Sequence, residues 1–322
     1  MSEPLEIDEL ETIAKHRGWL QADDQIISIG SAGAGNMNRV LRAHLVSGRC
    51  LIFKQSLPYV AKFPDIAAPV NRIGTEAAFY DAISGTQLTE HTPSIIGYAP
   101  ESFLLCMEDL GDGADLTTIY NKGLPAELPE LLTWLRTLHD LPINNPLDFA
   151  NTAMRELNHA HIFSIPFSTG NGLTFNAELQ DCRHALLSDE LSVRVVAMGK
   201  AYLKVRADQG SLLHGDFYPG SWLAHETRGF AVIDPEFGFY GPPEFDVGVM
   251  IAHLYFGGAL PSQVQTLLQA YNPSNTFSRD LSTAYAGIEI LRRIFGVAQL
   301  PLNHSDAQKV ALAQDAVEMV MQ

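Results

Sequence analysis

Hydrophobic residues recur along the chain with two different spacings, and the spacing changes about one third of the way along. In the first third, short apolar and β-branched runs predict strands. These runs are residues 26–29, 39–45, 51–55, 94–98 and 102–107. Apolar residues at helical spacing predict two helices in the same part, over residues 5–20 and 72–80. The first third is therefore expected to combine a sheet with few helices.

Helical spacing dominates the remainder of the chain. The predicted helices cover residues 128–141, 177–187, 192–206, 245–254, 261–271 and 281–295, and the last two are expected to complete the helical part. We place the boundary between the two parts after residue 109, which gives domains over 1–109 and 110–322. The fold class is α+β.

One supersecondary unit, residues 212–243, interrupts the helical pattern. Its apolar runs predict two strands, Trp222–Ala224 and Phe230–Ile233, joined by the polar turn 225–229. Asp216 precedes the first strand and Asp234 follows the second. Because a hairpin brings its outer ends together, we expect these two carboxylates to share one cleft.

The acidic groups at the ends of this hairpin point to a metal site. Asp216, Asp234 and Glu236 would repel one another at close range unless a cation neutralised them. Hard oxygen ligands that leave positions for water and phosphate suit Mg²⁺. The pattern indicates a metal and phosphate site, and the alternative is two ordinary turns with solvated carboxylates.

Composition narrows the class of protein. The chain has 322 residues, 46% of them hydrophobic, and a formal net charge of −16, which disfavours nucleic acid and anionic membranes as partners. Its three cysteines, Cys50, Cys106 and Cys182, have no metal-ligand spacing and favour reduced thiols in the cytoplasm. The acidic N-terminus does not resemble a signal peptide, and no apolar run is long enough to cross a membrane.

A glycine-rich turn and a lysine in the first third suit phosphate binding. The turn, residues 30–38, lies between two predicted strands, and glycine lets backbone N–H groups approach anionic oxygens. Lys54 ends the next strand, where a lysine is equally often solvent-facing. If Lys54 binds phosphates it needs an acidic partner, and Glu76 on the following helix is the candidate.

Several strings resemble those of aminoglycoside-phosphotransferase-like small-molecule kinases. His214-Gly215-Asp216, followed by a strand that ends in an acidic motif, is similar to the catalytic signature of that superfamily. The string 234–242 (DPEFGFYGP) and Gly35-Asn36-Met37-Asn38 resemble one branch, the 5-methylthioribose kinases. The resemblance implies a protein-kinase-like two-lobe fold, with an N-terminal antiparallel sheet and one main helix, then a larger helical lobe.

The resemblance also implies roles for individual residues. It implies that ATP is bound by Gly33, Gly35, Asn36, Asn38, Lys54, Glu76, Met107, Glu108 and Leu110. Asp216 would orient the acceptor hydroxyl and take its proton, and Mg²⁺ would be held by Asp234, Glu236 and Ser221. The substrate side is implied for Arg292, Arg293 and Tyr218, and a homodimer is expected by analogy with the branch.

Two further residues are expected to have structural roles. Asp246, near the start of helix 245–254, is expected to hold the Asp216 loop in shape. His139, in the amphipathic helix 128–141, is expected to be buried and structural.

The sequence departs from the branch where the acceptor should bind. Tyr218 and Pro219 replace a histidine and a threonine beside Asp216, and residues 296–300 (GVAQL) differ from the branch's GLAHV. The leading hypothesis is a kinase of methylthioribose or a related sugar. The alternatives are a kinase of an aminoglycoside or amino alcohol, a nucleotide-binding protein without catalysis, and a metal hydrolase.

Overall fold

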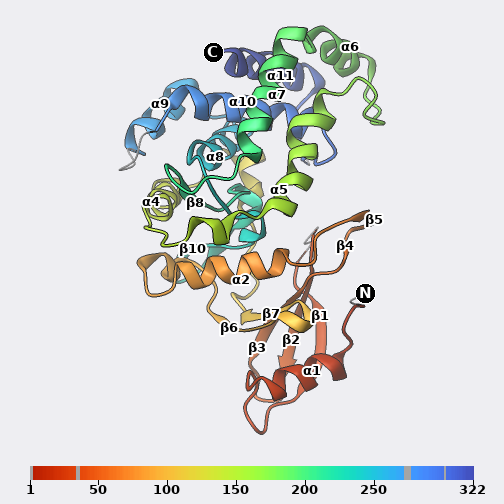
Figure 1. Cartoon of the computed structure of the whole chain (residues 1–322), viewed down its shortest axis with the longest axis vertical. Coiled ribbons are helices and arrows are strands. Elements are labelled where there is room, and N and C mark those ends of the chain that lie inside the picture. The colour runs from red at the N-terminus through yellow and green to blue at the C-terminus, as the bar shows by residue number, and fades with distance from the viewer. Residues whose placement is uncertain (1–2, 34–36, 272–276, 301) are drawn as a thin grey trace. The chain divides into compact units, whose positions relative to one another are not determined.

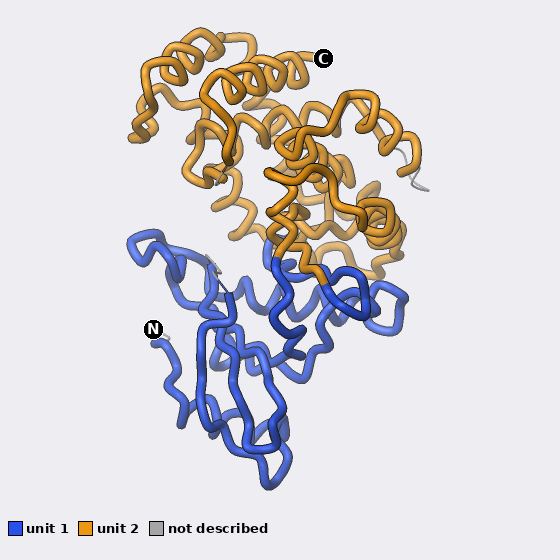
Figure 2. The backbone as a smooth tube through the Cα atoms, turned by 180° about the vertical axis from the view of Figure 1, so that it is seen from behind, with its two compact units in different colours: residues 1–114, 225–237 blue, residues 115–224, 238–322 orange. Residues whose placement is uncertain are grey.

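The computed structural model describes residues 3–33, 37–271, 277–300 and 302–322. The chain forms two compact units (Figure 2): unit 1 is Met1–Ala114 with His225–Phe237, and unit 2 is Asp115–Ala224 with Gly238–Gln322. The first division therefore falls five residues beyond the predicted boundary at 109, and a short later segment returns to unit 1.

Unit 1 is built on a five-stranded antiparallel sheet (Figure 1). Its strands, in spatial order, are β1 (Ile26–Ser31), β2 (Arg39–Leu45), β3 (Cys50–Gln55), β7 (Leu104–Glu108) and β6 (Ile95–Ala99). The helices of this unit are α1 (Ile7–His16) and α2 (Arg72–Ala82). The α+β prediction, with an antiparallel sheet in the first part, is confirmed.

Alternation along β3 decides which residues reach the site. Phe53 is fully buried in a cluster with Leu10 and Ala14 of α1. Since successive side chains of a strand point to opposite faces, Lys54 points away from that cluster, and it too is buried. It pairs with Glu76 of α2. The sheet thus separates an apolar face under α1 from a polar face toward α2.

Between β3 and α2, a small hairpin of β4 (Tyr59–Val60) and β5 (Phe63–Ala67) lies outside the predicted strands. These strands are too short and irregular in register to show a two-residue period in the sequence. The remaining strand of the unit is β10 (Gly229–Val232), which pairs with β9 (Trp222–His225) as the predicted hairpin.

Unit 2 is mostly helical. Its helices are α3 (Ile119–Lys122), α4 (Leu128–His139), α5 (Thr152–His159), α6 (Ala177–Leu186), α7 (Asp189–Leu203), α8 (Glu244–Phe256), α9 (Pro261–Ala270), α10 (Arg279–Phe295) and α11 (Asp306–Met321). A π-helical turn, Ala160–Ser164, continues α5. Two short strands, β8 (Ser211–Leu213) and β11 (Phe239–Gly241), pair antiparallel. No helix among the described residues is both long and apolar enough to cross a membrane.

Helices α8 and α10 form the centre of unit 2, and almost all of α8 is buried. Gly248 permits their close approach, because a Cβ there would lie 2.5 Å from Cβ of Tyr285. The prediction that the helix ending at Phe295 completes the fold is wrong, since α11 packs on α10. The buried face of α11 consists of Ala313, Ala316 and Val320, which is too weakly apolar to stand out in the sequence.

Candidate functional site

A buried ion-pair cluster in unit 1 centres on Lys54. Its Nζ lies 2.6 Å from Oε2 of Glu76 and 2.7 Å from Oδ1 of Asp234. The lysine and glutamate side chains are 3% and 0% exposed, whereas that of Asp234 is 42% exposed. The cluster therefore combines a buried ion pair, Lys54 with Glu76, and one accessible carboxylate, that of Asp234.

The electrostatics of this cluster follow from its burial. Burial opposes the charged form of Lys54, but Asp234 and Glu76 raise its pKa well above the ordinary value. Burial also raises the pKa of Glu76, and Lys54 acts against that rise. A cation as strongly held as Lys54 stays protonated at neutral pH and is suited to binding anionic oxygens.

Glu236 is fixed by a second set of contacts within unit 1. Its Oε2 accepts a 2.9 Å hydrogen bond from Nδ2 of Asn38 and lies 3.4 Å from Nε of Arg72. Asn38 in turn accepts hydrogen bonds through Oδ1 from Arg72 and Ser56. The Asn38 amide, predicted to bind nucleotide, is thus occupied in orienting Glu236 and Arg72.

The carboxylate oxygens of Asp234 and Glu236 are ligands of the kind that Mg²⁺ prefers, although they are few. Asp234 has a φ of 64°, a left-handed conformation that is uncommon outside glycine and is often found at functional sites. Among the described residues no group of three His, Cys, Asp or Glu side chains could hold a metal ion. Mg²⁺ bound with phosphates needs only one or two carboxylates, and Asp234 and Glu236 provide hard oxygens of that kind.

Asp216 of unit 2 lies in a loop whose backbone is fixed by hydrogen bonds to Asp246 of α8. Asp246 accepts hydrogen bonds from the backbone N–H groups of His214, at 2.7 Å, and Gly215, at 2.9 Å. Nε2 of His139 lies 3.2 Å from the same carboxylate, and Nδ1 of His139 contacts the hydroxyl of Tyr271. These contacts agree with the expectations that Asp246 shapes the loop and that His139 is structural.

The Asp216 side chain faces the tandem arginines of α10. Its Oδ1 lies 3.5 Å from Nη2 of Arg293. Glu289 joins the arginines, with Oε1 2.6 Å from Nε of Arg293 and Oε2 2.9 Å from Nη1 of Arg292. Burial raises the pKa of Asp216, while Arg293 and Arg292 lower it. The structure thus places both predicted arginines in one buried cluster with Asp216.

Tyr218 and Ser221 complete the surroundings of Asp216. The Tyr218 ring centroid lies 4.9 Å from Cζ of Arg293, within cation–π distance. Ser221 donates a 3.0 Å hydrogen bond to the backbone carbonyl of Asp216. Ser221 therefore helps to hold the Asp216 loop in shape.

The other predicted nucleotide residues are placed as follows. Gly33 has a φ of 105°, as a glycine turn requires, while Gly35 and Asn36 lie outside the described residues. Met107 is buried in β7, and Glu108 at its end lies 2.6 Å from Nη2 of Arg228. Leu110, two residues after Glu108, is half-buried.

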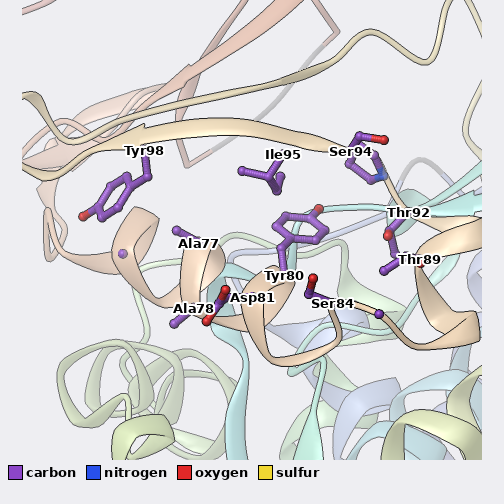
Figure 3. Close-up of a pocket in the computed structure, with 13 residues that line it drawn as sticks. Ala77, Ala78, Tyr80, Asp81, Ser84, Thr89, Thr92, Ser94, Ile95 and Tyr98 are labelled. Carbon is purple, nitrogen blue, oxygen red and sulfur yellow. The ribbon is translucent and has the colours of Figure 1, made fainter. Parts of the chain in front are cut away.

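A pocket of about 710 Å³ also lies in unit 1, between α2 and the segment around β6 (Figure 3). Ala77, Ala78 and Tyr80 contribute from α2, and Ile95 and Tyr98 from β6. Neither Lys54 nor Asp234 lines it. The pocket nevertheless borders the cluster, since burial, and after it the charges of Glu76 and Asp234, raise the pKa of its lining residue Tyr80.

Sequence reasoning missed three residues that organise these sites. Arg72 and Glu289 are buried between the predicted groups, and His253 contacts Glu289 from α8. Each lies in a predicted helix in which other residues were singled out: Glu76, Asp246, and the tandem arginines of α10. A charged residue inside an otherwise apolar helix, such as Glu289, was the available signal, since unpaired charge is rarely buried.

Comparisons with known proteins agree with this geometry. The model of the phosphotransferase enzyme family matches residues 32–284. The chain is 28% identical over 320 residues to a methylthioribose kinase of Bacillus pumilus, with 83% of this chain and 78% of the relative covered.

Solved structures show a similar fold. One is choline kinase LicA from Streptococcus pneumoniae, with a TM-score of 0.54, 14% identity, and 97% of this chain and 99% of that chain covered. Another is a spectinomycin phosphotransferase in complex with ADP and spectinomycin, with a TM-score of 0.50, 14% identity, and 99% and 98% covered. At these identities the likeness concerns the fold alone.

Proposed function

Because the chain belongs to the phosphotransferase enzyme family, we propose that it transfers the terminal phosphoryl group of ATP to a hydroxyl of a small polyhydroxylated molecule, with Mg²⁺. The observation that carries the proposal is the pairing of buried Lys54 with both Glu76 and Asp234. Such an arrangement presents a fixed cation and an accessible carboxylate together, which a phosphate chain and its metal require.

On the nucleotide side, Lys54 would bind phosphate oxygens while Glu76 holds its ammonium in place. Asp234 and Glu236 would hold Mg²⁺, which would supply neutralisation of the phosphate charge. Arg72 and Asn38 keep Glu236 oriented, so the second carboxylate loses little freedom when a ligand binds. Gly33 lies in the turn proposed to cover the phosphates.

On the acceptor side, Asp216 would orient the hydroxyl and accept its proton. Its loop is rigid because Asp246 ties down two successive backbone N–H groups. Arg293 beside it opposes the rise in pKa that burial causes, and so favours the ionised form that a general base needs. Phosphoryl transfer depends mainly on such positioning and on charge neutralisation.

Charge around Asp216 favours a neutral or anionic acceptor over a cationic one. Arg292 and Arg293 provide two positive charges, which Asp216 and Glu289 balance. A cationic amino alcohol or aminoglycoside would find no unpaired carboxylate among these four groups. We therefore propose methylthioribose or a similar neutral sugar as the acceptor class.

An ATP-consumption assay with Mg²⁺ tests the proposal. The panel contains methylthioribose, other pentoses, amino alcohols and aminoglycosides, and the Asp216→Asn variant serves as the inactive control. Turnover on a neutral sugar supports the proposal. Turnover only on cationic acceptors contradicts the acceptor class, and Mg-ATP binding without turnover on any acceptor contradicts the proposed activity on these compounds.

A further inference from the structure

A completely buried histidine contacts Glu289, the residue that pairs with both arginines of α10. His253 of α8 has its Nδ1 2.5 Å from the hydroxyl of Tyr120 and its Nε2 3.3 Å from Oε1 of Glu289. All three side chains are at least nine-tenths buried. They form a continuous polar chain, Tyr120–His253–Glu289, inside unit 2.

The chemistry of the neighbours fixes the protonation of this chain. Burial lowers the pKa of His253 to about 4, so the imidazole is neutral at neutral pH and carries one N–H. Although burial acts in the opposite direction, Arg292 and Arg293 hold the pKa of Glu289 well below its ordinary value. An ionised carboxylate only accepts hydrogen bonds, so Nε2–H donates to Glu289 and Nδ1 accepts from the Tyr120 hydroxyl.

This arrangement restricts Arg293. Oε1 of Glu289, the atom nearest His253, is also the atom nearest Nε of Arg293, at 2.6 Å. Nη2 of Arg293 is then directed toward Asp216. The Tyr218 ring lies over the guanidinium and is 5.0 Å, centroid to centroid, from the His253 ring.

Arg292 is held less completely than Arg293. Its Nη1 contacts Oε2 of Glu289 and its Nη2 is 3.5 Å from Oδ1 of Asn158, but its buried Nε has no hydrogen-bond partner. The two adjacent arginines are therefore in different situations, and only Arg293 is tied to Asp216.

We propose that His253 is a positioning residue for phosphoryl transfer: through Glu289 it fixes Arg293 against Asp216. The proposal rests on the proposed function only for its catalytic consequence. The orientation of Arg293 is a property of the protein itself and is measured without turnover.

The second Tyr–His–carboxylate chain of unit 2, Tyr271–His139–Asp246, provides a comparison. In this chain Asp246 accepts hydrogen bonds from the backbone of the Asp216 loop. In the His253 chain Glu289 contacts the side chain of Arg293 instead. Loss of the first should therefore alter the loop, while loss of the second should alter the orientation of one guanidinium.

Three variants test the proposal. His253→Phe keeps the ring among Tyr120, Tyr218 and Phe256 but removes both hydrogen bonds. His253→Gln restores a donor toward Glu289. Tyr120→Phe removes only the hydroxyl and serves if His253→Phe does not fold. Tyr255→Phe, on the same helix, is the matched control.

The direct readout is hydrogen exchange of the Arg293 Nε–H group in ¹H–¹⁵N NMR spectra, assigned with Arg293→Lys. We expect exchange to be about tenfold faster or more in His253→Phe, since a hydrogen bond between charged partners is weakened. The wild-type rate should return in His253→Gln and remain in Tyr255→Phe. Unchanged exchange in His253→Phe would overturn the proposal.

The kinetic readout separates this proposal from the proposed function. With an accepted substrate, His253→Phe should lower kcat about tenfold while the KM for ATP stays within about twofold. If the wild-type protein turns over no acceptor, the proposed function fails, and the NMR measurement still decides whether His253 orients Arg293. Faster exchange with unchanged kcat would show that the orientation exists but does not serve catalysis, which also overturns the proposal.

Discussion

The ammonium of Lys54 lies 2.7 Å from Oδ1 of Asp234, a residue 180 positions further along the chain. Asp234 belongs to the short segment 225–237 that returns to unit 1. Through this return, the strand-end lysine, Glu76 of α2 and the acidic motif after β10 form one cluster. The pairing keeps the Lys54 ammonium charged and fixed in position within a protein whose net charge is −16.

Removal of the Lys54 charge should destabilise the protein as well as weaken nucleotide binding. Lys54→Met leaves Glu76 buried without its cation, which typically costs about 3–5 kcal/mol. Urea denaturation measures this loss. The double variant Lys54→Met/Glu76→Gln should lose less stability than Lys54→Met alone but should still bind Mg-ATP poorly. Equal stability of the single and double variants would contradict the proposed pairing.

Replacement of Asp216 should separate catalysis from binding. Asp216→Asn preserves size but removes the base, so we expect turnover to fall by about 100- to 10,000-fold. The affinity for Mg-ATP, measured by calorimetry, should stay within about twofold. Asp234→Asn is the matched comparison. In contrast to Asp216→Asn, it should weaken the binding of Mg-ATP. Substantial turnover by Asp216→Asn would refute its assigned role.

The two arginines should affect different kinetic constants. Arg292→Ala should raise the KM for the acceptor more than it lowers kcat, because its guanidinium contacts Glu289 and Asn158 and not the Asp216 carboxylate. Arg293→Ala should mainly lower kcat, since its guanidinium lies beside Asp216. Initial rates over a grid of ATP and acceptor concentrations measure both effects. Identical kinetic changes in the two variants would argue against a division of roles.

The buried His253 should make stability depend on pH. Its pKa is about 4 in the folded protein against 6.5 for the ordinary group, so the unfolded chain binds more protons between these values. Its contribution to stability is complete above pH 6.5 and is lost as the pH falls toward 4, a change on the order of 3 kcal/mol.

Urea denaturation at several pH values between 7 and 4 measures that dependence. The free energy of unfolding should fall less steeply with decreasing pH in His253→Gln than in the wild type, because glutamine does not titrate. Parallel curves for the two proteins would mean that His253 is not buried in its neutral form.

The resemblance to small-molecule kinases, drawn from short strings such as 214–216 and 234–242, is confirmed by the family match over residues 32–284. Strands β2 and β3 and helices α2 and α4 were predicted within two residues at each end, because their apolar spacing is regular. Helix α11 was missed because its buried residues are small, and the β4–β5 hairpin was missed because it is short.

The sequence by itself determined the local elements and the residue types available at the site. Apolar and β-branched runs predicted the strands of the five-stranded sheet, and the acidic motifs predicted which carboxylates are available. Glu76 was predicted as the partner of Lys54 because a phosphate-binding lysine needs an acidic partner on the following helix, and the two side chains are paired.

Only the tertiary structure decided how those residues are paired. Which carboxylate meets which cation depends on contacts between segments far apart in the chain, such as Arg72 with Glu236 and Arg293 with Asp216. The spacing of residues in a sequence reports which side chains share a face of one helix or strand, but not which elements pack together. Adjacent residues of a helix point in different directions, but which partner Arg292 and Arg293 each meet is decided by packing against Glu289 and His253.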